Sequence, residues 1–341
     1  MMSSQKKKVR MKDIADKLNI SVNAVSLALN NKAGVSSETR QKVLEIANEL
    51  EYVDRSPSLI KKNQLNNICL MIEERNFKDV RFYSSVILGI ESEAKKNNYD
   101  LIVTFIDKNN YTIPSSIEQK KVSGIIIVGT VDDEYLKRVL YYGIPIIQVD
   151  NASFSINTDA VLTQNISGAY MATKYLIDNN HKEIGFFGEK DLTLSFYERW
   201  IGFNKSMEDN GLTIDEKLCL TNSIENYALK NDYKAVKEII EKMDKLPTAW
   251  VCANDSAAVT LINALNIINI RVPDDISVIG FDDIDLCKAI TPNLTTIRIN
   301  KNFMGAQAVR NLLWRMENID EPNYHTRMAV ELIERKSVKR I

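Results

Sequence analysis

Long apolar runs are absent from this chain of 341 residues. No stretch approaches the ~20 apolar residues that a membrane-spanning helix requires. The basic N-terminus is not followed by an apolar run, as it would be in a secretory signal. The sequence therefore predicts neither a membrane protein nor an exported one, and a cytoplasmic location is expected.

Cysteine and histidine are scarce as well. The four cysteines (Cys69, Cys219, Cys252 and Cys287) are widely scattered and lack metal-ligand spacing. Three of them lie in apolar runs and are expected to be buried free thiols, which fits a reducing cytosol. Of the two histidines, His181 and His325, the first precedes a predicted strand and is expected to be structural. No metal, no cofactor and no catalytic centre is expected.

Residues 11–50 carry the most distinctive pattern, three short helices and two turns behind a basic arm. Asn19 and Ile20 form the first turn, after which Ser21 can cap a second helix by accepting from a free backbone N–H. Ser36 is the expected cap of a third helix. One small core is predicted from Ile14, Leu18, Val25, Leu29, Val43, Ile46, Ala47 and Leu50. This layout is typical of a helix-turn-helix DNA-binding head.

The second of these helices is the candidate for reading DNA. Val25 and Leu29 face inward, which leaves Val22, Asn23 and Leu27 to point outward. Asparagine can pair with adenine through two hydrogen bonds, and apolar side chains can meet thymine methyl groups. A short helix with an exposed leucine could also belong to a protein–protein bundle, but the basic arm and the turn residues favour DNA.

Charge is distributed unevenly along the chain. Residues 1–62 contain twelve Lys or Arg and seven Asp or Glu, a net charge of +5, whereas the whole chain carries −1. The remaining residues therefore sum to −6. A basic head on an acidic body attracts phosphate at the head and repels it elsewhere.

From residue 66 onward, short apolar runs alternate with amphipathic segments. The runs predicted as strands are 67–72, 101–105, 124–128, 145–149, 184–187, 248–253 and 277–281. Helical patterns at 83–95, 166–178, 198–210, 232–242 and 256–265 separate most of them. This alternation predicts parallel sheets covered on both faces. About nine or ten strands are too many for one such sheet, so two α/β subdomains are expected.

Polar residues follow several of these strands, at the sheet edge where ligands of such folds collect. They are Asp150, Asn254, Asp255, Asp282, Asp283 and Asp285, with Ser195 and Arg199 before or at the start of a helix. Together they would line a cleft suited to a small molecule rich in hydroxyl groups. Any single Asp at a strand end can instead be a helix cap or a turn former.

Specific motifs along nearly the whole chain resemble those of the LacI/GalR family of bacterial transcription regulators. The head carries KDIADKLNIS (12–21) and GVSSETRQKV (34–43). The body carries IPIIQVD (144–150), NISGAYMATKYLI (165–177), ERWIGF (198–203), PTAWVCANDSAA (247–258), VPDDISVIGFDD (272–283) and PNLTTIR (292–298). The resemblance implies an α/β fold, namely a three-helix head, a hinge, and a two-subdomain core like the periplasmic sugar-binding proteins.

Functional residues follow from the resemblance position by position. The implied effector contacts are Phe82, Tyr83, Asp150, Ser195, Arg199, Asn254 and Asp282, with one of the two aromatic rings stacking on the effector. The implied DNA contacts are Lys12, Ser21, Val22, Asn23, Ser26, Leu27, Asn30 and Arg40, with Leu59 or Ile60 as an apolar wedge in the minor groove.

The resemblance also implies the domain organisation. Residues 1–52 would form the head, 53–65 the hinge, and 66–341 the core. The N-subdomain would comprise about 66–163 plus 293–321, and the C-subdomain about 164–291 plus 325–341. The chain would cross between them near Thr163–Asn165, Ala289–Pro292 and Asp320–His325.

The sequence departs from the family pattern at a few places. Leu27 stands where many members have Arg, so the operator should differ. Gln164 and Asn180 replace a common Asp and Gly. The hinge segment 54–61 reads DRSPSLIK and lacks the usual Asn…Ala-Arg-x-Leu pattern. Pro57 could begin a short hinge helix, but proline and serine suit a plain linker equally.

The leading hypothesis is a repressor that binds a near-palindromic DNA site as a homodimer and is controlled by an effector in the cleft. A sugar is favoured over a nucleoside as effector, and the effector could release or promote DNA binding. A solute receptor is disfavoured by the fused head. A glycosidase with Asp282 and Asp283 or Asp285 is disfavoured because adjacent carboxylates on extended chain point in opposite directions. The C-terminal run VELIERKSVKRI has no heptad repeat, so a coiled-coil tetramer is not supported.

Overall fold

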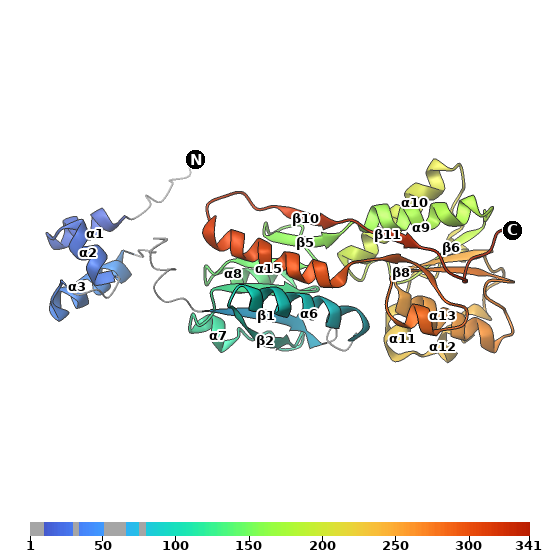
Figure 1. The fold of residues 1–341 in the computed structure, drawn as a ribbon, viewed down its shortest axis with the longest axis horizontal. Helices are drawn as coiled ribbons and strands as arrows, with labels where there is room; N and C mark the ends of the chain where they lie inside the picture. Colours follow the sequence, from blue (N-terminus) through green and yellow to red (C-terminus); the bar gives the residue numbers. More distant parts are fainter. Residues whose placement is uncertain (1–9, 30–33, 51–65, 75–79) are drawn as a thin grey trace. The chain divides into compact units, whose positions relative to one another are not determined.

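The computed structural model describes residues 10–29, 34–50, 66–74 and 80–341. It divides into two compact units, Met1–Gln64 and Leu65–Ile341, which are considered separately below (Figure 1). The predicted roles of Asn30, Leu59 and Ile60 and the hinge prediction for 53–65 fall outside the described residues. None of the helices in the described part is long and apolar enough to cross a membrane.

The first unit contains three short helices, α1 (Met11–Leu18), α2 (Val22–Leu29) and α3 (Ser37–Glu49). Asn19 ends α1 in the left-handed conformation (φ 52°), and the Ser21 hydroxyl then accepts from the backbone N–H of Ala24 at 3.1 Å. The Ser36 hydroxyl accepts from the N–H of Thr39 at 3.1 Å, as expected for a cap of α3. The buried core residues are Ile14, Ala15, Val25, Ala28, Val43 and Ala47, with Leu18, Leu29, Ile46 and Leu50 packed against them.

The second unit is built on two separate sheets. The first sheet has six parallel strands in the order β10-β5-β4-β3-β1-β2. These strands are β1 (Asn67–Glu73), β2 (Asp100–Ile106), β3 (Gly124–Val128), β4 (Ile146–Val149), β5 (Asp159–Thr163) and β10 (His325–Met328). Helices α6 (Val80–Lys96) and α15 (Lys301–Glu317) cover one face, and α7 (Ser115–Glu118) and α8 (Asp133–Leu140) cover the other.

The second sheet has five strands in the order β11-β9-β8-β7-β6, and β11 alone runs antiparallel to its neighbour. The strands are β6 (Ile184–Phe187), β7 (Ala249–Cys252), β8 (Ser277–Asp282), β9 (Thr295–Arg298) and β11 (Glu331–Ile333). Helices α9 (Asn165–Asp178) and α10 (Leu194–Asp209) pack on one face. Helices α11 (Ile224–Lys230), α12 (Tyr233–Ile240) and α13 (Asp255–Ile267) pack on the other. Two short helices, η1 (Glu216–Leu218) and α14 (Leu286–Ala289), complete this part.

Alternating apolar residues explain why both faces of each sheet are covered. On β1, Ile68 and Leu70 pack under α6 and α15, whereas Cys69 and Met71 pack with α7 and α8. A strand that is apolar on both sides must be covered twice, because successive side chains point to opposite faces. The predicted α/β core of two subdomains is therefore confirmed. We call the part built on the first sheet the first half, and the part built on the second sheet the second half.

The chain crosses between the halves three times. The first crossover, between β5 and α9, lies where it was expected. The second was expected near Ala289–Pro292 but follows β9, at residues 299–300, because Thr295–Arg298 pairs with β8 of the second sheet. The third was expected at Asp320–His325 but follows β10, because His325–Met328 pairs with β5 of the first sheet. The family resemblance had placed these two crossovers earlier in the chain, and the strand pairing moves them.

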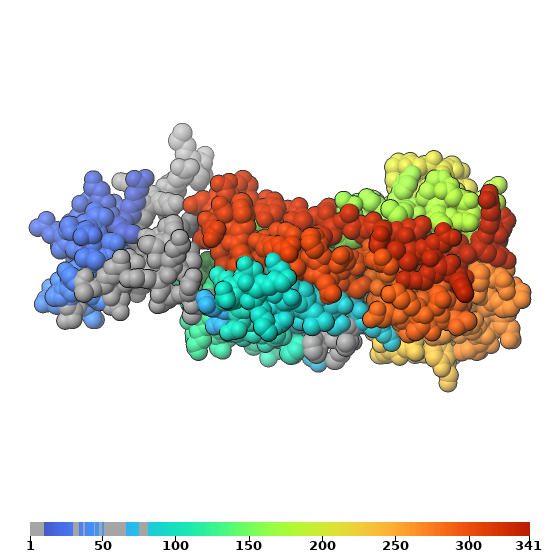
Figure 2. Space-filling view, viewed as in Figure 1, coloured from blue at the N-terminus to red at the C-terminus, as the bar shows by residue number. Residues whose placement is uncertain are grey.

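The C-terminal part of the chain therefore contributes to both halves. Helix α15 and β10 belong to the first half, and β11 and the last residues belong to the second, as the orange and red surfaces of Figure 2 show. His181 anchors this end of the chain, since its ring contacts Thr248 Oγ1 at 3.0 Å and the carbonyl of Lys339 at 3.1 Å. Burial lowers the pKa of His181, which fits a neutral structural side chain.

All four cysteines are free thiols. Cys69, Cys252 and Cys287 are buried, as expected, and Cys219 is half-buried. Burial raises the pKa of Cys219 to about 11, so this thiol stays protonated at neutral pH and reacts slowly.

Candidate functional site

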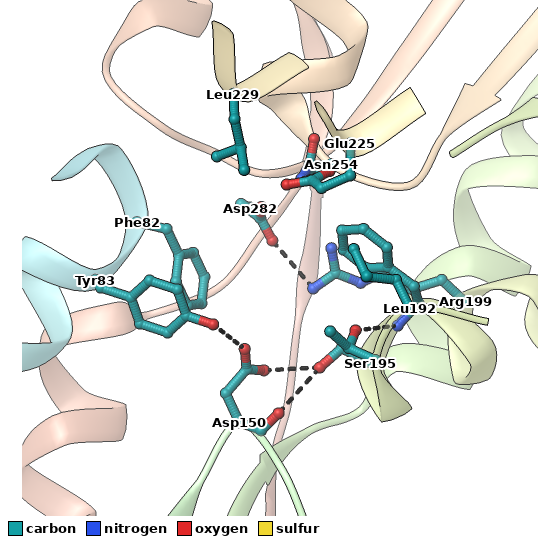
Figure 3. A pocket seen from close by; sticks show the side chains of 12 residues that line it. Phe82, Tyr83, Asp150, Leu192, Ser195, Arg199, Glu225, Leu229, Asn254 and Asp282 are labelled. Carbon is teal, nitrogen blue, oxygen red and sulfur yellow. Dashed lines mark hydrogen bonds and ion pairs between the residues drawn. The ribbon is translucent and has the colours of Figure 1, made fainter. Parts of the chain in front are cut away.

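A polar pocket lies between the two halves of the core, at the carboxyl ends of their strands (Figure 3). Its volume is about 510 Å³, counting the space that opens to solvent. The first half contributes Phe82, Tyr83 and Asp150, and the second half contributes Leu192, Thr193, Ser195, Phe196, Arg199, Glu225, Leu229, Asn254 and Asp282. All seven residues predicted as effector contacts thus line one pocket. Their role in binding stays a prediction.

Asp150 follows β4 and is held from both halves. Its backbone is left-handed (φ 61°), which turns the chain sharply at the end of the strand. Tyr83 on α6 donates its hydroxyl to Asp150 Oδ2 at 3.1 Å, and Ser195 on α10 donates to Oδ1 at 2.9 Å. Burial raises the pKa of Asp150, although Arg199 and the two hydroxyl donors oppose that shift.

Arg199 lies one turn after Ser195 on α10 and is almost completely buried. Its guanidinium donates to the carbonyl of Ala253 at 2.6 Å and to Asn165 Oδ1 at 3.0 Å, and it stacks on the Phe281 ring at 3.9 Å from the centroid. Its Nη2 lies 3.1 Å from Asp282 Oδ1. These contacts hold the planar donor group in one orientation facing the pocket.

Asp282 is the last residue of β8 and has an unusual backbone conformation (φ 115°). Burial raises the pKa of its carboxyl, and the nearby charge of Asp255 adds to the shift. The contact of Asp282 Oδ1 with Arg199 lacks hydrogen-bond alignment, so this buried oxygen keeps the capacity to accept from a ligand. Lys301 supports the turn by donating to the carbonyl of Asp282 at 2.5 Å.

Asp283 points away from Asp282 and into a separate ionic cluster. Its carboxylate accepts from Arg298 at 2.7 Å and from Arg335 at 2.5 Å. Burial alone would raise the pKa of Asp283, but the two guanidinium groups outweigh burial and lower it. The pair of carboxylates that glycoside hydrolysis would need at Asp282 and Asp283 is therefore not assembled. Asp285 directly precedes α14 and does not line the pocket.

Asn254 both caps a helix and lines the pocket, the two roles that the sequence left open for a polar residue at a strand end. Its side chain caps α13 by accepting from the N–H of Ala257 at 2.7 Å, and its amide also donates to Glu225 Oε2 at 3.2 Å at the pocket wall. Glu225 was not predicted as a lining residue. It comes from α11, where Leu229 lies four residues later on the same face and also lines the pocket.

The sequence analysis also missed the lining residues Leu192, Thr193 and Phe196, because it placed the start of the helix too late. The sequence predicted a helix from 198, but α10 begins at Leu194, after Thr193 caps it by accepting from the N–H of Phe196 at 3.2 Å. Threonine is a preferred residue at the start of a helix, so Thr193 is a capping signal that could have placed this start. The earlier start puts Ser195 in the first turn of α10 and Arg199 in the second.

Two aromatic side chains stand at the first-half wall of the pocket. The Phe82 and Tyr83 rings meet edge to face, with 4.9 Å between their centroids. Phe82 is buried with its ring toward the pocket, whereas the Tyr83 hydroxyl is engaged with Asp150. Phe82 is therefore better placed than Tyr83 to offer a ring face.

The three-helix unit presents the predicted DNA-contacting residues in two groups. Lys12, Ser21, Val22 and Asn23 are exposed, and Val22 keeps 46% of its surface accessible although it is apolar. Ser26, Leu27 and Arg40 are partly covered. Leu27 lies against Gly34, where an added Cβ would come within 3.2 Å of Leu27 Cδ1. The base-reading role of all these residues remains a prediction.

Within the described ranges, no group of His, Cys, Asp and Glu is arranged to hold a metal ion. The pocket instead offers one fixed guanidinium, three carboxylates, an amide, hydroxyl groups and three aromatic rings. This combination suits a neutral ligand with several hydroxyl or N–H groups, oriented by hydrogen bonds and one apolar face.

Together, a helix-turn-helix head and a core like the periplasmic binding proteins define a class of ligand-responsive regulators. Residues 10–54 match the family model for bacterial regulatory proteins of the lacI family, and residues 173–338 match a periplasmic binding protein-like domain. The chain is 30% identical over 96% of its length to the HTH-type transcriptional repressor PurR of Histophilus somni, of which 98% is covered. It is 32% identical over 96% of its length to the protein of that name from Photobacterium profundum, again with 98% covered. The chain belongs to the lacI family of bacterial regulatory proteins, which are regulators and not enzymes.

Solved structures agree with this fold. A complex of the transcriptional regulator CelR with cellobiose superposes with a TM-score of 0.69 at 20% identity, covering 96% of this chain and 99% of that one. A lacI-family regulator from Enterococcus faecium with bound ribose superposes with a TM-score of 0.69 at 24% identity. The match covers 80% of this chain and 99% of that one. The lac repressor dimer bound to operator and an anti-inducer superposes with a TM-score of 0.65 at 23% identity. The match covers 98% of this chain and 100% of that one. The predicted fold class and family are confirmed.

Proposed function

We propose that this protein is a sequence-specific transcriptional repressor whose affinity for DNA is controlled by a small molecule in the pocket between the two halves of the core. The head, residues 1–52, binds DNA, residues 53–65 connect it, and residues 66–341 bind the effector and the second subunit. The repressors of H. somni and P. profundum, which match this chain over almost its full length, support this assignment.

One observation carries the proposal most directly: the pocket is closed by side chains from both halves that meet at Asp150. Tyr83 comes from the first half and Ser195 from the second, and both donate to this one carboxylate. A ligand that competes for these donors, or bridges Asp150 and Arg199, interacts differently with open and closed arrangements of the halves. Only such a difference in affinity lets a ligand shift a conformational equilibrium.

The effector is a neutral, hydroxyl-rich molecule, with a sugar favoured over a nucleoside. Carboxylates at Asp150, Glu225 and Asp282 accept hydrogen bonds from hydroxyl groups, and Arg199 donates to a ring or hydroxyl oxygen. Phe82 offers an apolar face for a ring. Structural relatives bound to cellobiose and to ribose support the sugar class.

On the DNA side, α2 reads bases and the exposed Lys12 contributes to phosphate attraction. A single three-helix head covers little DNA, so two heads of a homodimer on a near-palindromic site are the expected arrangement. The dimer of the structurally related lac repressor on its operator supports this geometry. The protein is expected to act in the cytoplasm, where its DNA target lies.

The direct test is enrichment of genomic DNA fragments on the purified full chain at near-physiological salt. The matched control is the same chain truncated before Asn66, which keeps the core and lacks the head. Recovery of a shared, near-palindromic sequence by the full chain alone supports the proposal. Equal recovery by both chains, or no enrichment with any sugar or nucleoside present, would contradict it.

A further inference from the structure

Glu198, the chain neighbour of Arg199, faces away from the pocket and into a cluster that joins the halves. Its carboxylate accepts from Arg327 Nη2 at 2.8 Å and Nη1 at 3.1 Å, a two-pronged contact with good geometry. The side chain of Glu198 is only 7% exposed, and that of Arg327 is 41% exposed. Glu198 is therefore a buried charge whose only guanidinium contact in the described structure comes from Arg327.

The two partners belong to different halves of the core. Glu198 lies on α10, which packs on the second sheet, whereas Arg327 lies on β10, which pairs with β5 of the first sheet. Met328 ends β10, and the chain then enters the third crossover to reach β11. Any rotation of one half against the other moves these two side chains relative to each other.

Asn165 connects this ion pair to the pocket. It is the first residue of α9, immediately after the first crossover. Its amide donates to Glu198 Oε2 at 3.0 Å, and its carbonyl oxygen accepts from Arg199 Nε at 3.0 Å. A continuous polar chain therefore runs from Arg327 through Glu198 and Asn165 to the guanidinium that faces the ligand.

We propose that Glu198 and Arg327 are positioning residues that set the resting balance between open and closed arrangements of the two halves, without touching the ligand. The proposal rests on the ligand-controlled function above and adds a named element of its regulation. A buried carboxylate that loses its guanidinium is strongly disfavoured, so the pair favours the arrangement in which the two side chains meet. Removing it shifts the population of that arrangement before any ligand binds.

The test uses the ligand-free full chain with spin labels on exposed positions of the two halves. Tyr141 lies at the end of α8 in the first half and Lys242 follows α12 in the second, and both positions are exposed. Distance distributions between Y141C and K242C labels are recorded in the parent chain and in Arg327→Met and Glu198→Gln variants. Labels on one subunit of a mixed dimer keep the measurement within one chain.

A closely matched control exists in the first half. Arg310 and Glu93 form an ion pair with similar exposure, 43% and 10%, at 2.9 Å, but α15 and α6 both belong to the same half. We expect Arg327→Met and Glu198→Gln each to change the ratio of open to closed populations by about fivefold. The double variant should change it no further, because one interaction is lost in each case. Arg310→Met should leave the ratio unchanged.

An unchanged distance distribution in both Arg327→Met and Glu198→Gln, with only the thermal stability lowered as in Arg310→Met, would overturn the proposal. This outcome is separable from failure of the proposed function, because the measurement requires neither DNA nor ligand. If the chain enriches no DNA but the variants still change the distance distribution, the repressor assignment is wrong and the positioning role of Glu198 and Arg327 is supported.

Discussion

Ser195, on a helix of the second half of the core, donates its hydroxyl at 2.9 Å to Asp150 Oδ1, in a turn of the first half. The Ser195 hydroxyl also lies 3.2 Å from the carbonyl oxygen of Asp150, so one short side chain binds the turn at two points. Because Asp150 is half-buried and also accepts from Tyr83, this contact couples the entrance of the pocket to the relative position of the halves.

Replacing Ser195 by Ala should therefore weaken the core and the effector response together. The half-buried Asp150 carboxylate loses one of its two hydroxyl donors, which costs about 1–3 kcal/mol of unfolding free energy. Ser206→Ala is the control, since this serine is on the same helix and is also buried, but its hydroxyl has no hydrogen-bond partner within the described structure. Equal stability losses in urea unfolding of the two variants would contradict the role of Ser195.

Arg199→Ala should abolish the effector response and spare the head. Removing one partner of a buried ion pair leaves Asp282 uncompensated and costs about 3–5 kcal/mol in the core. Arg199→Lys retains a charge but loses the planar donor fork, so it should fold better and still fail to respond. DNA affinity without effector should remain within about threefold of that of the parent. A threefold change in affinity corresponds to less than about 1 kcal/mol of binding free energy. A parallel loss of DNA affinity and effector response in the well-folded Lys variant would refute the separation of roles.

Asn23→Ala should reduce affinity for the specific DNA site by about 1–3 kcal/mol and leave effector binding unchanged. The reason is that the side chain of Asn23 is exposed on α2, where its amide can pair with a base edge. Gln41→Ala, an exposed amide on α3, is the control and should have a smaller effect. Fluorescence anisotropy on specific and random duplexes separates the two cases, and an equal loss on both duplexes would show that Asn23 does not read bases.

Asp255 should give the core a distinctive pH dependence. This fully buried carboxylate accepts from Thr296 Oγ1 at 2.6 Å and from the N–H of Ile284 at 3.0 Å, and burial raises its pKa to about 6. Because the pKa in the folded chain lies above the ordinary value of 3.8, the stabilising contribution of Asp255 is complete below about pH 4. That contribution is lost as the pH rises through 6. The unfolding free energy of the parent minus that of Asp255→Asn should therefore be larger at pH 5 than at pH 7.

A surface carboxylate provides the control for this pH profile. The Arg271 guanidinium lowers the pKa of Asp275 to about 2, so the contribution of Asp275 is present above about pH 4 and constant between pH 5 and 7. The unfolding free energy of the parent minus that of Asp275→Asn should therefore be the same at pH 5 and at pH 7. Chemical unfolding across the same pH range measures both differences. If the difference in unfolding free energy between the parent and Asp255→Asn is also independent of pH, Asp255 does not titrate in this range.

The parts of this structure that follow local chemistry could be predicted from the sequence. Ser21 and Ser36 cap helices because a short hydroxyl side chain reaches a free N–H, and the alternating strands and helices of the core follow from apolar runs at regular intervals. The residues Asp150, Asn254 and Asp282 were found because parallel strands bring their carboxyl ends to one sheet edge.

The parts that depend on long-range pairing could not be predicted in the same way. The run Thr295–Arg298 is extended whichever sheet it joins, so only its pairing with β8 places it in the second half. Glu225 and Leu229 reach the pocket because α11 packs against α13, a contact that the spacing of their own residues does not encode. Arg327 is 129 residues from Glu198 in the chain, and only the parallel pairing of β10 with β5 brings the two together.

The measurement that tests the central claim most directly is DNA affinity with and without a pocket ligand. A panel of sugars and nucleosides is first screened by thermal shift on the full chain, and the strongest stabiliser is then titrated into the complex of the chain with its enriched DNA fragment. We expect the compound to change the DNA affinity of the parent by about fivefold or more, and to have no effect on Arg199→Lys. A compound that binds in the pocket and leaves the DNA affinity of the parent unchanged would contradict control of the head by the core.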